Sequence, residues 1–203
     1  MRLDPFYPIV DSAGWVARLV PLGVKLIQLR IKDADETALF FEIDRARRVC
    51  EGHGCTLVVN DHWRLAIGAG CDFVHLGQED LDEADLDLIR SSGTRIGIST
   101  HDEAELDRAL SLRPDYVALG PIRRTTLKPM RWEPQGFERI GEWRRRIGDL
   151  PLVAIGGLKV DDASDVLSAG ADCIAVVSDI IANDDPLART REWLAATQFR
   201  RLS

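Results

Sequence analysis

Short apolar runs alternate with longer segments of helical periodicity along the whole chain. Runs of this length, bounded by polar or glycine residues, are typical of buried strands in a parallel sheet. We expect eight strands, over Phe6–Val10, Leu26–Leu29, Thr56–Val59, Phe73–Leu76, Arg95–Ile98, Tyr116–Leu119, Leu152–Ile155 and Cys173–Val177. Eight strand–helix repeats predict an α/β fold, the (β/α)8 TIM barrel, as one compact domain over residues 1–203. A doubly wound open sheet is the alternative.

The clearest predicted helix lies between the second and third strands. The apolar positions that recur there at helical spacing are Leu39, Ile43, Ala46 and Cys50. After the fifth strand, Thr100 and Glu103 have the spacing of a capping box and predict another helix start. Gly170 is expected to end the helix before the eighth strand. The basic run Arg144–Arg146 is expected to be a solvated helix face outside the barrel.

Composition and charge narrow the function classes. The chain has 26 Lys and Arg against 33 Asp and Glu, and this net charge of −7 disfavours nucleic acid or an anionic membrane as a partner. No apolar run approaches the roughly 20 residues that a membrane-spanning helix needs. The amino terminus has no apolar signal core and the four cysteines form no C-x-x-C pair. We therefore expect reduced thiols and a cytoplasmic protein.

Polar residues follow the second strand, where a buried parallel strand should be apolar. Because side chains alternate along a strand, Gln28, Arg30 and Lys32 share one face. If Leu29 and Ile31 face the helices, the three polar side chains face the barrel axis. Burying two cations without a counter-charge is costly, which indicates an anionic, phosphate-bearing ligand. An internal ion pair with nearby aspartates is the alternative.

Carboxylates follow the next two strands. Asn60 and Asp61 come directly after the third strand, and Asp80 follows the fourth. Active sites of TIM barrels lie at the carboxyl ends of the strands, so the two aspartates are expected at one rim position. They would repel one another unless a cation joins them, and Mg²⁺ is commonly held by one or two carboxylates together with substrate phosphates. The alternative is that both cap helices. His75, within the fourth strand, is expected to be a hydrogen-bonded core residue rather than a base.

The remaining strand ends favour a second phosphate group. Ser99 and Thr100 are candidate hydrogen-bond donors or simple helix caps. The loop after the sixth strand, Arg123 to Lys128, is basic and hydroxylic, although a solvated loop is the alternative. Gly156-Gly157 and Val177-Ser178 end the last two strands, where barrels often bind phosphate through backbone N–H groups. We therefore expect a diphosphate with magnesium near strands two to four and a monophosphate near strands six to eight.

These residues, in this order, resemble the thiamine-phosphate synthase family over roughly Tyr7 to Trp193. The matching motifs are Gln28-Leu29-Arg30-x-Lys32-Asp33, Asn60-Asp61, Val74-His75-Leu76-Gly77-Gln78-Glu79-Asp80, Gly97-Ile98-Ser99-Thr100-His101, Gly120-Pro121 with Thr125 and Lys128, Ile155-Gly156-Gly157 and Val177-Ser178. The family is a group of transferases that join 4-amino-5-hydroxymethyl-2-methylpyrimidine diphosphate to hydroxyethylthiazole phosphate. The products are thiamine phosphate and pyrophosphate.

The resemblance also implies roles for individual residues. The pyrimidine diphosphate would be bound by Gln28, Leu29, Arg30, Ile31, Lys32, Asn60, Ser99 and Lys128, of which Arg30, Lys32, Ser99 and Lys128 would be catalytic. One Mg²⁺ would be held by Asp61 and Asp80. The thiazole phosphate would be bound by Thr125, Thr126, Leu127, Gly157, Val177 and Ser178. The implied partners are small phosphorylated substrates, and the oligomeric state stays open between a monomer and a homo-oligomer.

One position departs from the family pattern. The loop after the sixth strand usually reads Thr-x-Thr-Lys, and here Leu127 replaces the second threonine. One side-chain donor to the thiazole phosphate is lost, for which Thr126 or a backbone N–H could substitute, and Arg123 and Arg124 add charge nearby. Two other functions remain as alternatives: a thiazole tautomerase of the same barrel family, and a non-catalytic regulator that binds thiamine-type phosphates. The diphosphate-binding cations and the aspartate pair disfavour both.

Overall fold

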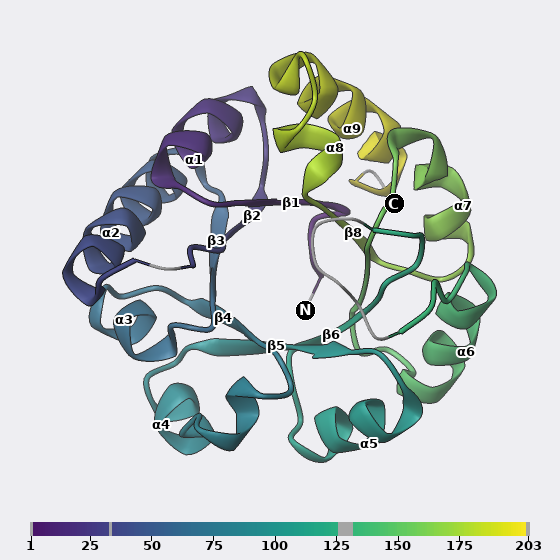
Figure 1. Ribbon diagram of the computed structural model, residues 1–203, viewed down its shortest axis with the longest axis horizontal. Helices are drawn as coiled ribbons and strands as arrows, with labels where there is room; N and C mark the ends of the chain where they lie inside the picture. Colours follow the sequence, from purple (N-terminus) through teal and green to yellow (C-terminus); the bar gives the residue numbers. More distant parts are fainter. Residues whose placement is uncertain (1, 33, 126–131, 202–203) are drawn as a thin grey trace.

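The computed structural model describes residues 2–32, 34–125 and 132–201 and forms a closed barrel of eight parallel strands. The strands are β1 (Phe6–Val10), β2 (Leu26–Leu29), β3 (Thr56–Asn60), β4 (Phe73–Leu76), β5 (Arg95–Thr100), β6 (Tyr116–Leu119), β7 (Leu152–Ile155) and β8 (Cys173–Val176). Each strand pairs with its sequence neighbours, and β1 pairs with β8 through Phe6 and Ile174, which closes the ring (Figure 1). The TIM-barrel prediction is thus confirmed, and this closure excludes the open doubly wound sheet.

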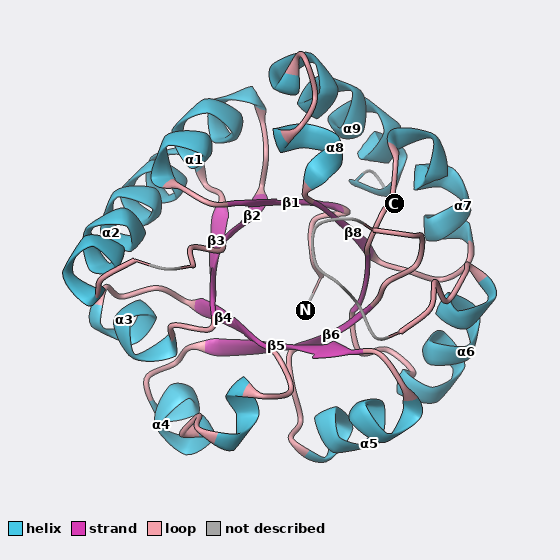
Figure 2. Ribbon diagram, viewed as in Figure 1, coloured by secondary structure: helices cyan, strands magenta, loops and turns pink. Residues whose placement is uncertain are grey.

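Helices surround the barrel on its outer side (Figure 2). They are α1 (Ala13–Leu19), α2 (Glu36–His53), α3 (Trp63–Gly68), α4 (Leu86–Ser91), α5 (Glu103–Ser111), α6 (Glu138–Ile147), α7 (Ala163–Ser168), α8 (Ser178–Ile181) and α9 (Pro186–Arg201), with short 3-10 turns η1 (Val20–Leu22), η2 (Asp80–Asp82) and η3 (Val160–Asp162). The predicted face of α2 is confirmed, because its buried residues are Leu39, Ile43, Ala46 and Cys50. Among the described residues, none of these helices has both the length and the apolar character needed to cross a membrane.

Strand alternation divides the apolar residues into two cores. Side chains that point outward pack between the strands and the helices. Side chains that point inward fill the barrel, and this inner cluster contains Leu3, Tyr7, Ile9, Leu26, Val58, Phe73, Tyr116, Ala118, Val153, Cys173 and Ala175. Gly97 makes room for one of them, because a Cβ there would lie 2.1 Å from the ring of Tyr116. The inner cluster closes the bottom of the space at the carboxyl ends of the strands, where the polar residues lie.

The start of α5 differs from the sequence-based expectation. The capping box of Thr100 and Glu103 is wrong: Asp102 caps α5, and its Oδ1 accepts a hydrogen bond from the Glu105 N–H at 2.9 Å. Strand β5 instead continues through Thr100. The buried Thr100 hydroxyl donates to the Ala118 carbonyl at 3.0 Å and accepts from the Trp143 indole N–H at 3.0 Å. Thr100 therefore anchors the outer core and does not face a ligand.

The basic run on α6 is also more structural than the sequence indicates. Arg144 is half-buried, pairs with Asp172, and donates to the carbonyls of Gly170 (2.9 Å) and Leu150 (3.0 Å). It links α6 to the loop before β7 and to the loop before β8, so the expected solvated face is wrong for this residue. Arg145 and Arg146 are exposed, as expected.

All four cysteines, Cys50, Cys55, Cys71 and Cys173, are buried and free. Burial raises the pKa of the Cys71 thiol to about 12 and that of Cys173 well above its usual value. A thiol held in its protonated form is a poor nucleophile and a poor metal ligand. The prediction of reduced core cysteines is confirmed.

Candidate active site

A cavity of about 840 Å³ opens at the carboxyl ends of the strands. Its walls include most of the residues singled out from the sequence. These are Gln28, Arg30, Lys32, Asn60, Asp61, Asp80, Ser99, Thr125, Gly157, Val177 and Ser178. The closed barrel brings them together although they span most of the chain, because the carboxyl ends of all eight strands meet at one mouth.

Five of the residues implied by the family resemblance are not placed in this cavity. The side chains of Leu29 and Ile31 pack in the outer core and do not line the cavity, so the substrate contact implied for them stays a prediction that only their backbone could provide. Strand alternation explains the difference, because Leu29 and Ile31 occupy the face opposite to Gln28 and Arg30. The other three, Thr126, Leu127 and Lys128, lie outside the described residues.

On one side of the cavity, cations project from the end of β2. Arg30 is half-buried and Lys32 is exposed, and neither side chain forms an ion pair or hydrogen bond with a described residue. The alternative of an internal ion pair with an aspartate is therefore not seen in the described part of the chain. Two cations without a protein counter-charge leave this side of the cavity suited to an anionic group.

Asp61 and Asp80 form an acidic pair beside these cations. Burial and the charge of Asp80 raise the pKa of Asp61 to about 6. The backbone of Asp61 has a φ of 62°, in the left-handed region, and its N–H donates to the His75 carbonyl at 2.9 Å. Neither carboxylate caps a helix, because α3 and η2 begin without a side-chain cap and Asp80 instead accepts from the Gly77 N–H at 2.8 Å. Repulsion between two partly buried carboxylates is relieved when they share a cation.

A chain of hydrogen-bonded side chains crosses the cavity floor. The Gln28 amide donates to the Tyr7 hydroxyl at 2.8 Å, and the Tyr7 and Tyr116 hydroxyls are 3.1 Å apart. The Tyr116 hydroxyl is 2.7 Å from Nδ1 of His75, whose Nε2 is 2.8 Å from the Ser99 hydroxyl. Burial lowers the pKa of His75 to about 4, so the imidazole is neutral near pH 7. His75 is thus a hydrogen-bonded core residue, as expected. For the two tyrosines, the only indication in the sequence is that they are polar aromatic residues in otherwise apolar strands.

The opposite side of the cavity includes two glycines after β7. Gly156 and Gly157 have φ values of 103° and 67°, which favour glycine. A Cβ at Gly157 would lie 2.3 Å from the Arg124 carbonyl oxygen, so the loop after β6 rests directly on the loop after β7. The described residues that line the cavity here are glycine, aliphatic and hydroxyl residues, namely Thr125, Ile155, Gly156, Gly157, Leu158, Val177, Ser178 and Ile181.

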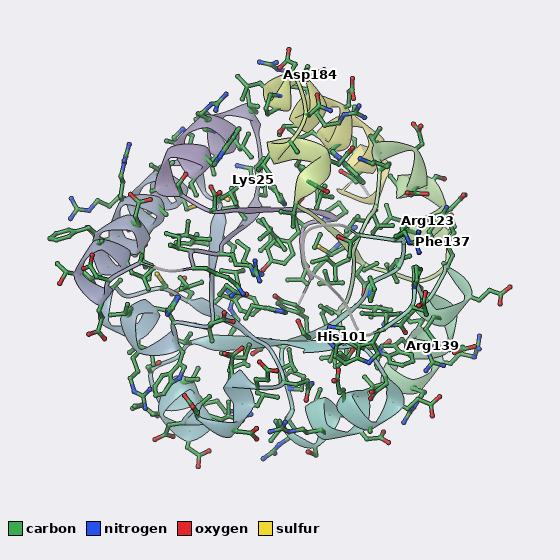
Figure 3. All side chains as sticks on the ribbon, viewed as in Figure 1. Lys25, His101, Arg123, Phe137, Arg139 and Asp184 are labelled. Carbon is green, nitrogen blue, oxygen red and sulfur yellow. The ribbon has the colours of Figure 1, made fainter. Side chains whose placement is uncertain are left out.

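The expectation that Arg123 adds charge to this side is wrong. Its guanidinium pairs with Asp162 at 2.9 Å and lies over the ring of Phe137, 4.4 Å from the centroid (Figure 3). These contacts direct the side chain toward the outer helices. The ion pair with Asp162 and the contact with Phe137 connect the loop after β6 to η3 and to the start of α6.

Three further cavity residues were not identified from the sequence. The ring of His101 stacks on Trp132 with centroids 4.0 Å apart and an interplanar angle of 13°. Nδ1 of His101 is 2.7 Å from a carboxylate oxygen of Glu105. Trp132 is a lone aromatic residue after a basic loop, and Glu105 lies one helical turn after His101. Only the fold shows that all three line the cavity.

Comparison with known proteins assigns this site to a family. A family model described as thiamine monophosphate synthase matches residues 6–180. A thiamine-phosphate synthase of Rhizobium etli is 63% identical over 97% of each chain, and one of Neisseria meningitidis serogroup B is 44% identical over 94% of this chain and 93% of its own. The structure of a thiamine phosphate pyrophosphorylase from Pyrococcus furiosus is 25% identical, covers 97% of this chain and 96% of its own, and superposes with a TM-score of 0.86. The chain described here belongs to the thiamine monophosphate synthase family.

Proposed function

We propose that the cavity at the carboxyl ends of the strands joins the two phosphorylated halves of thiamine phosphate. The chain is a transferase of thiamine biosynthesis. Its substrates are the diphosphate of 4-amino-5-hydroxymethyl-2-methylpyrimidine and hydroxyethylthiazole phosphate, and its products are thiamine phosphate and pyrophosphate. Family membership over nearly the whole chain supports this activity.

One structural observation connects the proposed activity to particular residues of the cavity. A single cavity of about 840 Å³ holds unpaired cations and an acidic pair on one side and glycine backbone on the other. The first side suits a diphosphate with a metal ion, and the second suits a monophosphate. Two differently bound phosphate groups with space between them are what a coupling reaction of two phosphorylated substrates requires.

On the diphosphate side, the proposed role of Arg30 and Lys32 is to stabilise charge. As the C–O bond to the pyrimidine methylene breaks, negative charge builds on the departing pyrophosphate. Arg30 and Lys32 line the cavity without a protein partner in the described chain, so both are available to that group. Lys128, outside the described residues, takes the same role in this proposal, and Gln28 and Asn60 orient the diphosphate substrate.

Asp61 and Asp80 are the proposed holders of one Mg²⁺. The residues fit the ion, because both are carboxylates and the raised pKa of Asp61 reflects burial beside a second negative charge. In the described part of the chain no three His, Cys, Asp or Glu side chains gather into a metal site. A pair suffices for an ion that is also held by substrate phosphate. When bound, the ion neutralises charge on the diphosphate.

The reaction needs no nucleophile from the protein. Pyrophosphate leaves with the electron pair of the C–O bond, the amino-substituted ring stabilises the cationic methylene carbon, and the lone pair of the thiazole nitrogen forms the new C–N bond. Ser99 is hydrogen-bonded to His75 like the first two members of a hydrolase triad. His75 is a weak base, since burial lowers its pKa to about 4, and its other nitrogen faces a tyrosine hydroxyl and not a carboxylate. Ser99 is therefore assigned to substrate binding.

On the monophosphate side, Thr125, Gly157, Val177 and Ser178 are the proposed contacts of the thiazole phosphate. Gly157 has a positive φ and no side chain, so the loop after β7 lies directly against the loop after β6 at the edge of the cavity. Peptide N–H groups can then reach the phosphate directly, with Ser178 adding a hydroxyl donor. This side holds the thiazole nitrogen toward the pyrimidine methylene.

The compartment proposed for this reaction is the cytoplasm. Four free, buried cysteines support a reducing environment. The net charge of −7 supports small phosphorylated molecules, and not nucleic acid or an anionic membrane, as partners.

Product analysis tests the proposed activity. The purified protein is incubated with both phosphorylated precursors and Mg²⁺, with each precursor alone, and with both precursors and excess chelator. We expect thiamine phosphate and pyrophosphate in equal amounts only when both precursors and the metal ion are present. Isomerisation of the thiazole substrate alone would indicate the tautomerase, and saturable binding without turnover would indicate the regulator. Either outcome would overturn the proposal.

A further inference from the structure

The hydrogen-bonded chain on the cavity floor has no part in the chemistry described above except at its two ends. Gln28 and Ser99 face the cavity, and Tyr7, Tyr116 and His75 connect them across its floor, where Tyr7 and His75 also border the cavity. Tyr7 and Tyr116 are 1% and 0% exposed and are the two tyrosines of the protein. Buried hydroxyl groups retained in an apolar barrel interior are costly unless every one is hydrogen-bonded. Here each has two partners.

With the Gln28 amide as the donor at one end, the requirement that each buried hydroxyl hydrogen has an acceptor implies one direction for this chain. The Gln28 amide donates to the Tyr7 oxygen, which leaves the Tyr7 hydrogen for Tyr116. The Tyr116 oxygen accepts that hydrogen, so its own hydrogen is directed to Nδ1 of His75. A neutral imidazole with Nδ1 as acceptor carries its proton on Nε2. Nε2–H then donates to the Ser99 oxygen.

The hydroxyl hydrogen of Ser99 is the last donor in this chain of hydrogen bonds. Its oxygen already accepts from His75, and within the described residues the side chain has no second partner. The Ser99 carbonyl is fixed separately, because it accepts from the Gln78 amide at 2.7 Å. The remaining direction for the hydroxyl hydrogen is the cavity that Ser99 lines.

We propose that the Gln28–Tyr7–Tyr116–His75–Ser99 chain sets Ser99 as a hydrogen-bond donor to the bound substrate. Tyr7, Tyr116 and His75 are positioning residues, because they act through Ser99 and do not touch the reacting atoms. The recognised group is a hydrogen-bond acceptor on the pyrimidine diphosphate, so this inference rests on the proposed function. A substrate with a donor at that position would face the Ser99 hydrogen and be rejected.

Local packing holds the chain in one arrangement. The ring of His75 lies parallel to that of Tyr116, with centroids 5.5 Å apart and an interplanar angle of 15°. The Tyr116 ring occupies the space that Gly97 leaves free. Phe73 packs against the same ring at 5.4 Å. With both rings fixed, neither the imidazole nor the phenol can turn to another partner.

The tautomer of His75 tests the direction of the chain without any substrate. The protein has four histidines, so ¹⁵N NMR at pH 7 of the wild type and of His75→Asn identifies the His75 signals by difference. We expect a protonated Nε2 and a bare Nδ1. A protonated Nδ1 would mean that the chain runs in the opposite direction and that Ser99 donates to His75, which would overturn the proposal. Because this readout needs no turnover, it stands even if the proposed coupling activity fails.

Two tyrosine variants test the consequence for the substrate. Tyr116→Phe removes the donor to Nδ1, so both His75 tautomers become populated and Ser99 loses its fixed orientation. We expect kcat to fall about tenfold, the effect of losing one oriented hydrogen bond in the transition state, while KM for the thiazole phosphate stays unchanged. Tyr7→Phe is the matched control: Tyr116 keeps its hydroxyl and still donates to His75, so the Nε2–H tautomer persists and kcat falls less.

The result against the proposal is equally specific. Equal losses of kcat in both variants with an unchanged His75 tautomer would show that the tyrosines serve packing alone. Wild-type kcat in Tyr116→Phe would show that the orientation of Ser99 has no role. If Tyr116→Phe does not fold, the tautomer of the wild-type protein still decides the direction.

Discussion

The two sides of the cavity offer different groups to the phosphates of the proposed substrates. On the β2–β4 side, the groups are long or charged side chains, Arg30, Lys32, Asp61 and Asp80. On the β6–β8 side the described lining residues are glycine, aliphatic and hydroxyl residues, among them Gly157, Leu158 and Ser178. The first side holds two cations without an ion-pair partner among the described residues and two repelling carboxylates, whereas the described lining residues of the loops after β6, β7 and β8 include no charged side chain.

This difference indicates how each side responds to change. A side chain that contacts phosphate can be shortened or exchanged, and the loss is graded with its charge and reach. Gly157 has no such latitude, since one added carbon both strains its backbone and meets the Arg124 carbonyl oxygen of the loop after β6. The diphosphate side also depends on a metal ion in this proposal. We therefore expect substitution of an aspartate of the acidic pair to reduce the coupling rate more than any other change.

The largest expected effect is that of Asp61→Asn. Asparagine tolerates the left-handed φ of 62° and keeps the shape of the side chain, but removes the charge proposed to hold Mg²⁺. We expect coupling to slow by several orders of magnitude, while thermal unfolding of the metal-free protein is unchanged or shifted upward, because one of two repelling carboxylates is gone. Steady-state rates across a magnesium titration, with calorimetry, provide the measurement. A near-normal rate at saturating magnesium would remove the metal role.

Gly157→Ala is expected to have the next largest effect, on the opposite side. The added Cβ would meet the Arg124 carbonyl oxygen at 2.3 Å, and the φ of 67° is strained for alanine. We expect KM for the thiazole phosphate to rise about 100-fold, equivalent to about 2.7 kcal/mol, with binding of the pyrimidine diphosphate unaffected. Gly54→Ala is the matched control, because Gly54 has a φ of 58° at the end of α2 and open space around its Cβ position. If both variants bind the thiazole phosphate normally, the backbone site is not where we place it.

Lys32→Ala tests the graded response of the cationic side. The side chain is exposed at the cavity mouth, and loss of one charged contact with phosphate should raise KM for the pyrimidine diphosphate about tenfold. Lys32→Arg should recover most of that loss. Lys25→Ala is the control, since Lys25 lies before β2 and its ammonium donates to the His53 carbonyl at 2.8 Å (Figure 3). Equal effects of the two alanine variants would point to general electrostatics and not to a local contact.

Asp179→Asn should have the smallest effect on substrate binding. It tests whether the β6–β8 side of the cavity depends on charge, as the β2–β4 side does. Asp179, next to Ser178, is buried, accepts from the Trp193 indole N–H at 2.9 Å and pairs with Lys159 at 3.0 Å. Asparagine keeps the acceptor for the indole and loses the pair with Lys159, whose side chain is 62% exposed, together with the long contact to Arg189 at 4.0 Å. We expect KM for the thiazole phosphate to change by about threefold or less. A much larger change would mean that the β6–β8 side also depends on charge, and the contrast between the two sides would fail.

The sequence was sufficient for the barrel and for much of its rim. Apolar runs of strand length located all eight strands, because in a parallel barrel each strand is buried on both faces. Alternation along β2 correctly separated Arg30 from Leu29. The errors occurred where a local pattern had two interpretations: Thr100 resembles a helix cap in sequence, yet β5 continues through it and Asp102 takes that position.

Contacts across the barrel could not be predicted from the sequence. Tyr7 and Tyr116 are 109 residues apart, and their hydroxyls meet only because β1 and β6 face one another inside the closed ring. Arg144 reads as part of a solvated basic run, yet the loop before β8 supplies Asp172 as its partner. In both cases the determining property is a distance between remote segments, which no local pattern encodes.

The central claim is that one cavity binds two phosphate groups on opposite sides by different means. A crystal structure of the protein with thiamine phosphate, pyrophosphate and Mg²⁺ tests it most directly. The account predicts pyrophosphate and the metal ion against Arg30, Lys32 and the Asp61–Asp80 pair, and the phosphate of thiamine phosphate against Gly157 and Ser178. Both groups on the same side, the reverse arrangement, or binding outside the barrel mouth would contradict it.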